Sequence, residues 1–356
     1  MANYHISENE GIVGWESPSN IALVKYWGKH GNQLPMNPSL SFTLKNSVVR
    51  LKVHYSVGHE KEDILQNFSL NGLPNEKFKT RINTFLASMK VQYQFLSLLR
   101  MNIESISTFP HSAGIASSAA AFSALALVLE TLNDTFSNNS TLPEEFYRKA
   151  SNSARLGSGS ASRSVYGGYT VWGSTPAITN SSDDYAIQLK SNDIHPVFDN
   201  IHDAILIADA GEKAVSSSQG HALMQNHPYR NSRIIQAGKN LDTLLYALKT
   251  GEEQMFAEVV ENEALTLHGL MMTSNPGYVL MKPNTLLMID KIREFRLHTG
   301  VNICFTLDAG PNIHLIYLDK DKRIVRDWIE NKIKSLCCDE KWIDDGIGEG
   351  PIPLTF

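Results

Sequence analysis

The segment PHSAGIASSAAAFSALALVLE, residues 110–130, places the strongest constraint on how this chain can fold. From Ala119 to Leu129 nearly every residue is apolar, so a helix here must be covered on most of its circumference. The polar groups are confined to the start of the segment, where small residues lead into Ser117 and Ser118. We therefore expect a buried helix whose polar end is its N-terminus.

Two interpretations fit this helix start. A helix N-terminus exposes unpaired N–H groups and a partial positive charge, and Gly114 with its small neighbours would let a phosphate approach the backbone. Serine is also a favoured N-cap, so Ser117 and Ser118 could simply cap a core helix. The chain has no GxxxxGK[ST], GxGxxG or GxSxG motif at this point, so a P-loop, Rossmann or α/β-hydrolase site is not indicated.

The composition is that of a globular chain of enzyme size, with 356 residues, 42% of them hydrophobic and 19% charged. A net charge of -5 gives no reason to expect binding to a nucleic acid or an anionic membrane. The first residues lack the pattern of a signal peptide, and no apolar run approaches a membrane span, so we expect a cytoplasmic protein. Three cysteines cannot form a disulfide framework, and we expect Cys304 to lie in the core.

Strands and helices are mixed without regular βαβ alternation, which predicts an α+β fold. A polar stretch predicts a boundary near residue 190 between two lobes, residues 1–190 and 191–356. In the first lobe we expect strands at 46–57 and 63–72, paired antiparallel, helices near 76–100, 117–133 and 143–155, and a strand at 167–173. In the second we expect a strand at 203–209, helices near 228–249, 252–269 and 284–298, two strands joined by a tight turn at 309–311, and a helix from about 322.

Residues 18–31, PSNIALVKYWGKHG, form a second motif. Lys25 and Lys29 flank an aromatic pair beside glycines, and their ammonium groups could hold a polyanionic ligand with Tyr26 as a directional donor. The alternative is an edge strand whose lysines face solvent, because exposed lysine is common.

Two further motifs carry charged residues on turns. In RLGSGSASRSVYGG, residues 155–168, Arg163 offers a planar fork for a carboxylate or phosphate, although a flexible Gly/Ser turn is the alternative. In TLDAGPN, residues 306–312, Asp308 ends an apolar strand and either caps the turn or places a carboxylate at a cleft. Together, the helix start, the lysines, the arginine and this aspartate make a plausible phosphoryl-transfer set.

In this order the motifs resemble those of the diphosphomevalonate decarboxylases, a branch of the GHMP family of small-molecule kinases. NIALVKYWGKHGNQLPMNPSLSFTL resembles the N-terminal signature, PHSAGIASSAAAF the ATP phosphate loop, GSGSASRS the substrate loop and DAGPN the C-terminal catalytic turn. Weaker similarity at 213–220 and 261–296 extends the resemblance over nearly the whole chain. The kinases of the family typically carry GLGSSAA and a glycine-rich C-terminal motif, so GIASSAA and DAGPN favour the decarboxylase branch.

The resemblance implies a GHMP kinase-like fold of two lobes, the first like domain 2 of ribosomal protein S5 and the second ferredoxin-like, with the active site in the cleft between them. It also implies that ATP, arriving with Mg²⁺, phosphorylates the tertiary 3-hydroxyl of mevalonate 5-diphosphate, after which phosphate and carbon dioxide leave to give isopentenyl diphosphate. A homodimer is implied as well. Two alternatives remain open: a kinase or decarboxylase acting on mevalonate or its 5-phosphate, and a non-catalytic binding protein on the same scaffold.

The resemblance also implies roles for individual residues. Asp308 would orient the hydroxyl and accept its proton, Lys25 would stabilise the developing negative charge, and Arg163 would hold the substrate carboxylate. The expected substrate-binding residues are Asn20, Tyr26, Trp27, Gly28, Lys29, Arg81, Ser158, Gly159, Ser160, Ala161, Ser162, Ser217 and Ser218. The residues expected to hold the ATP phosphates are Ser112, Ala113, Gly114, Ile115, Ala116, Ser117 and Ser118. No dedicated carboxylate cluster is visible, so no protein metal ligand is predicted.

Overall fold

The computed structural model describes residues 9–58, 63–110, 115, 117–211 and 215–356. Among these residues, the N-terminal lobe is built on a sheet of eight strands in the order β14-β1-β4-β7-β5-β6, with β8 on a second stretch of β4 and β9 on β8. The strands of this lobe are β1 (Glu10–Val24), β4 (Ser39–Val57), β5 (Leu65–Leu70), β6 (Leu73–Pro74), β7 (Leu99–Ser107), β8 (Tyr169–Trp172), β9 (Ala186–Gln188) and β14 (Ile352–Pro353), with a separate hairpin of β2 (Lys29–His30) and β3 (Leu34–Pro35).

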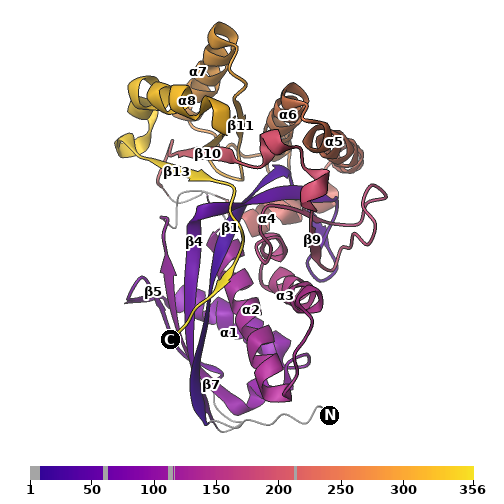
Figure 1. Ribbon diagram of the computed structural model, residues 1–356, viewed down its shortest axis with the longest axis vertical. Coiled ribbons are helices and arrows are strands. Elements are labelled where there is room, and N and C mark those ends of the chain that lie inside the picture. Colours follow the sequence, from indigo (N-terminus) through magenta and orange to yellow (C-terminus); the bar gives the residue numbers. More distant parts are fainter. Residues whose placement is uncertain (1–8, 59–62, 111–114, 116, 212–214) are drawn as a thin grey trace.

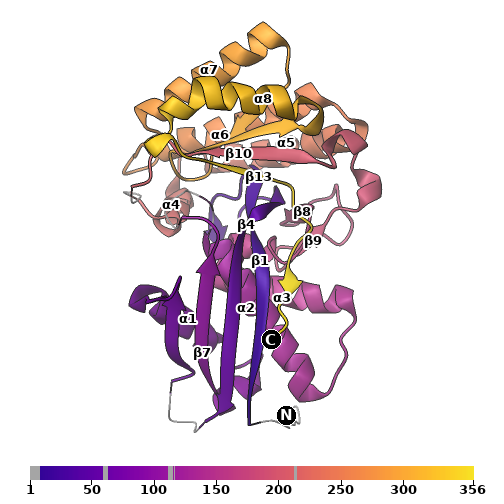
Figure 2. The same ribbon diagram turned by 60° about the vertical axis from the view of Figure 1, so that its left-hand side comes forward.

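Helices cover one face of this sheet (Figures 1 and 2). They are α1 (Glu76–Met89), α2 (Ser117–Ser137) and α3 (Pro143–Gly157). The helix α2 is buried along most of its length and packs on β1 and β4, as its apolar sequence predicts. The helix runs along the sheet so that its first turn points toward the second lobe and its last turn lies at the far end of the N-terminal lobe (Figure 1).

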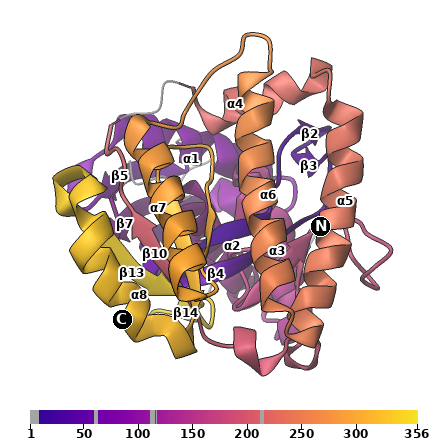
Figure 3. The same cartoon turned by 90° about the horizontal axis from the view of Figure 1, so that it is seen from above.

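The C-terminal lobe is a ferredoxin-like unit. Its described strands form a four-stranded antiparallel sheet in the order β11-β12-β10-β13, and the helices between them give the βαββαβ arrangement. The helices α5, α6, α7 and α8 cover the face of this sheet away from the N-terminal lobe, whereas α4 lies on the side of that lobe (Figures 2 and 3). The elements are β10 (Ile201–Leu206), α4 (Ser217–Leu223), α5 (Arg230–Thr250), α6 (Glu253–Met272), α7 (Pro283–Thr299), β11 (Cys304–Thr306), β12 (Ile313–Leu318), α8 (Lys322–Trp328) and β13 (Trp342–Gly346).

One hydrophobic cluster joins the two lobes. It contains Ile21 and Phe42 from the first sheet together with Ile205 from the second sheet and Leu241 from α5. A polar contact adds to it, because the Asp345 carboxylate accepts hydrogen bonds from the two successive backbone N–H groups of residues 45 and 46, at 2.9 and 2.8 Å. The same cluster contains Val24 at the end of β1 and Cys304 of β11, so these two strands lie close together where the lobes meet.

Two sequence expectations for the first lobe are wrong. Residues 63–72 were expected to pair antiparallel with residues 46–57 of β4. Instead β5 pairs in parallel with β7, and β7 lies between β4 and β5. The helix expected over 76–100 ends at Met89, and the chain enters β7 at Leu99. The remaining predicted helices and the 304–318 hairpin are confirmed, as is the burial of Cys304, which is 3% exposed. In the described part of the chain, no helix combines the length and apolarity needed to cross a membrane.

Candidate active site

The centre of the candidate site is a contact between the ends of β1 and β11. Lys25 follows β1 and Asp308 follows β11, and Lys25 Nζ donates a hydrogen bond to Asp308 Oδ1 at 2.9 Å. The lysine is 2% exposed, whereas 26% of the aspartate side chain is exposed. The pair is thus sealed on the lysine side and open on the aspartate side, which excludes the alternative in which Lys25 lies on an edge strand and faces solvent.

Lys25 is fixed in this position by the protein around it. Its Nζ also donates to the carbonyl of Ala22 at 2.7 Å, and its backbone N–H donates to Glu263 of α6 at 2.8 Å. Glu263 forms a fully buried ion pair with Arg233 of α5, with contacts of 2.6 and 2.7 Å, and Arg233 also donates to the Lys25 carbonyl. Both members of the pair bond to the backbone of Lys25, which favours a single position for it.

Arg163 is the second cation that interacts with the pair of Lys25 and Asp308. Between Ser158 and Arg163 the chain makes a 3₁₀ turn, and the arginine that follows is 2% exposed. Its guanidinium donates to Asn20 Oδ1 from two nitrogens, both at 3.2 Å, and to Ser39 Oγ at 2.6 Å. Asn20 is itself anchored to the carbonyl of Ser160 at 3.0 Å. The structure thus brings together Asn20 and Arg163, both of which are predicted site residues.

The charges of the site act on one another. Burial lowers the pKa of the Lys25 ammonium, an effect that Asp308 opposes and that Arg163 reinforces. Burial also lowers the pKa of the Arg163 guanidinium to about 10, with Asp308 opposing the shift. Arg163 therefore remains a cation at neutral pH, so the site presents positive charge around one carboxylate. Such a site suits an anionic ligand with a group that must be oriented or deprotonated.

The residues after Lys25 line the same region. Tyr26 packs its ring on that of Trp172, with centroids 4.7 Å apart, and burial raises its pKa. A Cβ at Gly159 would lie 2.7 Å from the Tyr26 hydroxyl oxygen, so the close approach of this loop to Tyr26 requires glycine. Gly28 has φ +91°, a left-handed conformation that turns the chain into the β2–β3 hairpin and its Lys29.

The start of α2 is linked to this region through an arginine. Arg81 of α1 donates to Ser118 Oγ at 2.9 Å and to the carbonyl of Gly157 at 3.2 Å. Its charge also acts on Lys29, whose pKa is lowered by burial and by Arg81. The predicted residues Arg81, Lys29 and Ser118 therefore form one positively charged region beside the first turn of α2.

Other predicted residues are placed differently. The hydroxyl of Ser162 donates to the carbonyl of Gly159 at 2.8 Å, so it serves the loop itself. Ser217 and Ser218 lie exposed in the first turn of α4, which is capped by the preceding Ser216. Ala161, Ile115 and Trp27 are buried, each in a different hydrophobic cluster, whereas Ser158 and Ser160 are partly exposed. Four predicted residues lie outside the described residues: Ser112, Ala113, Gly114 and Ala116.

Sequence reasoning missed three residues of this region. The pair of Glu263 and Arg233, described above, lies on two amphipathic helices, where charged residues ordinarily face solvent. His221 of α4 packs against Tyr26 and Trp27, with ring centroids 4.3 and 4.6 Å apart. The only available signal for the histidine was its position directly after the serine-rich segment at 213–220, and residue type alone does not distinguish it from a surface histidine.

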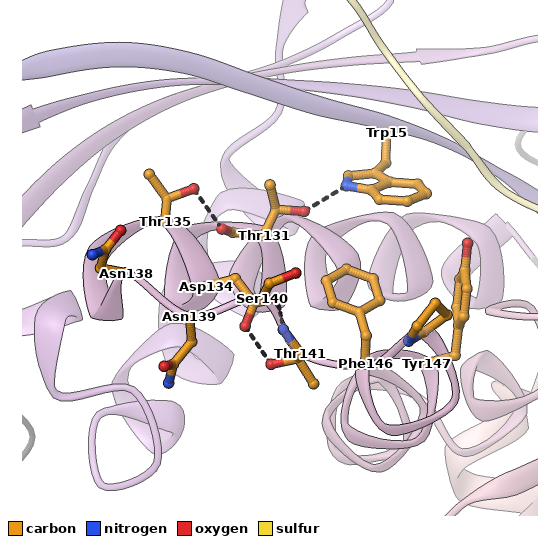
Figure 4. Close-up of a pocket in the computed structure, with 11 residues that line it drawn as sticks. Trp15, Thr131, Asp134, Thr135, Asn138, Asn139, Ser140, Thr141, Phe146 and Tyr147 are labelled. Carbon is orange, nitrogen blue, oxygen red and sulfur yellow. Dashed lines mark hydrogen bonds between the residues drawn. The ribbon is translucent and has the colours of Figure 1, made fainter.

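A surface pocket lies away from this site. Its volume is about 710 Å³, and it is formed at the C-terminal end of α2 and the start of α3, beneath Trp15 (Figure 4). There the Trp15 indole donates to Thr131, and Thr141 bonds to Asp134. The candidate site is at the opposite end of α2. In the part of the chain that the structure describes, no group of three or more His, Cys, Asp or Glu side chains could hold a metal ion.

The two-lobed α+β fold, with a ferredoxin-like second lobe and a charged centre between the lobes, defines a GHMP-type protein. The sequence model of the diphosphomevalonate decarboxylase-like N-terminal domain matches residues 17–186, and that of the mevalonate 5-diphosphate decarboxylase C-terminal domain matches residues 204–345. These two matches cover both lobes. The chain therefore belongs to the diphosphomevalonate decarboxylase family.

Individual relatives agree with this assignment. The diphosphomevalonate decarboxylase of Eremothecium gossypii is 30% identical over 329 residues, which are 87% of this chain and 79% of the relative. The crystal structure of mevalonate diphosphate decarboxylase from Staphylococcus aureus is 27% identical in sequence, with a TM-score of 0.83. The match covers 99% of this chain and 100% of that chain. A structure of MDDEF in complex with MVAPP, AMPPCP and magnesium is also 27% identical, with a TM-score of 0.82 over 98% of this chain and 100% of that chain.

Proposed function

We propose that this protein catalyses the ATP-dependent decarboxylation of mevalonate 5-diphosphate to isopentenyl diphosphate. The observation that carries the proposal is the 2.9 Å contact between Lys25 Nζ and Asp308 Oδ1 at the junction of the lobes. The contact joins a buried cation to a carboxylate that is partly exposed. A phosphoryl transfer to a hydroxyl needs both groups, the carboxylate to activate the hydroxyl and the cation to stabilise the transferred phosphoryl group. Relatives named for this reaction, and a neighbour with MVAPP and an ATP analogue, support the proposal.

In the first step, Asp308 orients the 3-hydroxyl and accepts its proton as the hydroxyl oxygen bonds to the γ-phosphorus of ATP. A tertiary alcohol is a weak nucleophile, so a carboxylate held at a fixed position favours attack. Lys25 supplies positive charge beside the transferring group, in a buried setting where charge is poorly screened. The products of this step are ADP, the 3-phosphorylated intermediate and the proton taken up by Asp308.

In the second step, the bond between C3 and the phosphate oxygen breaks, and positive charge develops at C3. The bond between C1 and C2 then breaks, its electron pair forms the C2–C3 double bond, and carbon dioxide and phosphate leave. Arg163, held by Asn20 and Ser39, would keep the carboxylate aligned for this departure. The diphosphate would be held by Lys29 and Arg81.

Mg²⁺ would arrive with ATP and neutralise part of the charge of its phosphates. The described residues fit this partner through the N-terminus of α2, where Ser117 and Ser118 open a long buried helix beside Arg81. The division of the chain near residue 190, a cytoplasmic location and a homodimer are also proposals, supported by the sequence expectations above.

The test is to incubate the purified protein with MgATP and, separately, with mevalonate, its 5-phosphate and its 5-diphosphate, and to measure ADP and carbon dioxide. We expect both products with the 5-diphosphate. ADP without carbon dioxide would instead identify a kinase that stops after phosphorylation. No consumption of any of the three would contradict enzymatic activity on this class of substrate and favour a binding protein.

A further inference from the structure

The ring of His221 bridges α4 and the segment that follows Lys25. It packs against the rings of Tyr26 and Trp27, with centroids 4.3 and 4.6 Å away. Its Nδ1 accepts a hydrogen bond from the backbone N–H of Gly28 at 3.0 Å. The imidazole is therefore fixed at two faces and one edge, and its remaining polar atom is Nε2.

The hydrogen bond from Gly28 assigns the tautomer. An Nδ1 that accepts a hydrogen bond carries no proton, so in the neutral ring the proton is on Nε2. Burial, with smaller contributions from Lys29 and then Arg163, lowers the pKa of His221 to about 3. The ring is neutral at physiological pH and has one N–H to donate.

The position of this donor matches a phosphate ligand. Among the described residues, no hydrogen-bond acceptor for Nε2 is found, whereas its neighbours Lys29 and Arg163 are cations. The N–H that bonds to His221 belongs to Gly28, the residue directly before Lys29, which associates the ring with the diphosphate end of the proposed site. A neutral N–H between positive groups complements an anionic oxygen.

We propose that His221 is a substrate-binding residue whose Nε2–H donates a hydrogen bond to a diphosphate oxygen of mevalonate 5-diphosphate. This inference rests on the proposed function, because it takes its ligand from that reaction. It adds to the site a residue on α4 that sequence reasoning did not select, and it gives the contact between α4 and the Tyr26–Lys29 segment a role in recognition.

Two substitutions separate the two ring nitrogens. His221→Asn keeps an acceptor near the position of Nδ1 and can retain the bond from Gly28, but it lacks a donor at the position of Nε2. His221→Gln reaches the position of Nε2 with an amide N–H. We expect the affinity for mevalonate 5-diphosphate, measured by calorimetry without ATP, to weaken about 10-fold to 100-fold in His221→Asn and to be largely restored in His221→Gln.

The matched control is His227→Gln. His227 is 6% exposed, its Nε2 bonds to the carbonyl of Leu270 at 3.0 Å, and its Nδ1 accepts a hydrogen bond from the N–H of Tyr229 at 3.1 Å. This variant should lose stability and keep its affinity for the substrate. A role of His221 in packing alone predicts the reverse order, with Asn better than Gln, and that result would overturn the inference.

The pH dependence gives an independent readout. The titratable and charged groups that face His221 are Tyr26, Lys29 and Arg163, with Tyr278 approaching α4 at Gly220. If His221 binds as a neutral donor, the ratio of the dissociation constants of His221→Asn and wild type stays constant from pH 5.5 to 8. If it binds as a cation, the ratio rises as the pH falls through about 6.5, and the inference is wrong.

The same experiment separates this inference from the proposed function. A wild type that binds mevalonate 5-diphosphate but releases no carbon dioxide contradicts the proposed reaction and still measures the contribution of His221 to binding. A wild type that does not bind mevalonate 5-diphosphate overturns both. Equal affinity of His221→Asn and wild type overturns the inference alone.

Discussion

Replacing Asp308 with asparagine removes the negative charge opposite Lys25 and leaves the side-chain volume nearly unchanged. Lys25 Nζ then loses its 2.9 Å ion pair but keeps its bond to the carbonyl of Ala22. Removing one partner of a fully buried pair costs about 3–5 kcal/mol. Because 26% of the Asp308 side chain is exposed, we expect a smaller loss in the free energy of unfolding, about 2–3 kcal/mol at pH 7.

The sign of the pH dependence follows from Lys25. Its folded pKa is lowered below the ordinary value of 10.5, and removing Asp308, which raises it, lowers it further. Between the folded pKa and 10.5 the unfolded chain binds the proton that the folded chain has released, so stability rises with pH. Because the folded pKa of Lys25 is lower in the variant, this rise in stability begins at a lower pH there. The stability difference between Asp308→Asn and wild type should therefore shrink as the pH rises from 7 toward 10, as measured by urea denaturation.

Activity should respond much more strongly than stability. Loss of a positioned general base typically costs 10²–10⁴-fold in rate, so we expect ADP and carbon dioxide formation by Asp308→Asn to fall about 1,000-fold at saturating substrate. The control is Asp319→Asn, because Asp319 also follows a strand of the second sheet but is 63% exposed in its contact with His202. Full activity of Asp308→Asn with an unchanged melting curve would remove Asp308 from the mechanism.

Three further substitutions test other parts of the site. Arg163→Lys keeps a positive charge but loses the fork that bonds Asn20, so carbon dioxide release should fall about 100-fold, and a change below twofold would contradict its role. Arg81→Met should weaken binding of mevalonate 5-diphosphate about 10-fold in calorimetry at low salt, with a smaller difference in 1 M salt, and a salt-independent loss would argue against a charge contact. Glu263→Gln leaves Arg233 buried without its ion-pair partner, so urea denaturation should show a loss of about 3–5 kcal/mol, and an unaltered midpoint would refute the proposed anchoring.

The sequence predicted the helices better than the strand partners. The apolar periodicity of α2, α5 and α6 identifies each of them to within a few residues, because one helix face or more must be buried. The alternating pattern of residues 63–72 indicates a strand but carries no information on which neighbour it joins. Its true partner, β7, begins at Leu99 directly after a short 3₁₀ helix at Gln94–Leu98, so the helix expected over 76–100 extended into the first two residues of this strand.

The same limit applies to the candidate site. Asp308 at a strand end and Arg163 after a glycine-rich turn are visible in sequence because their local context is unusual. The burial of Lys25 at 2% exposure is not, since it depends on Glu263 and Arg233, more than 200 residues away in the chain. His221 acquires its tautomer and its neutral state only from the fold, through Gly28 and the surrounding charges.

The central claim is that one site both phosphorylates and decarboxylates its substrate. The most direct measurement is the amount of carbon dioxide released per ADP formed when the wild-type protein acts on mevalonate 5-diphosphate with MgATP. We predict one carbon dioxide and one free phosphate for each ADP, with isopentenyl diphosphate as the product. ADP formed without carbon dioxide, or with a stable phosphorylated product, would contradict the account.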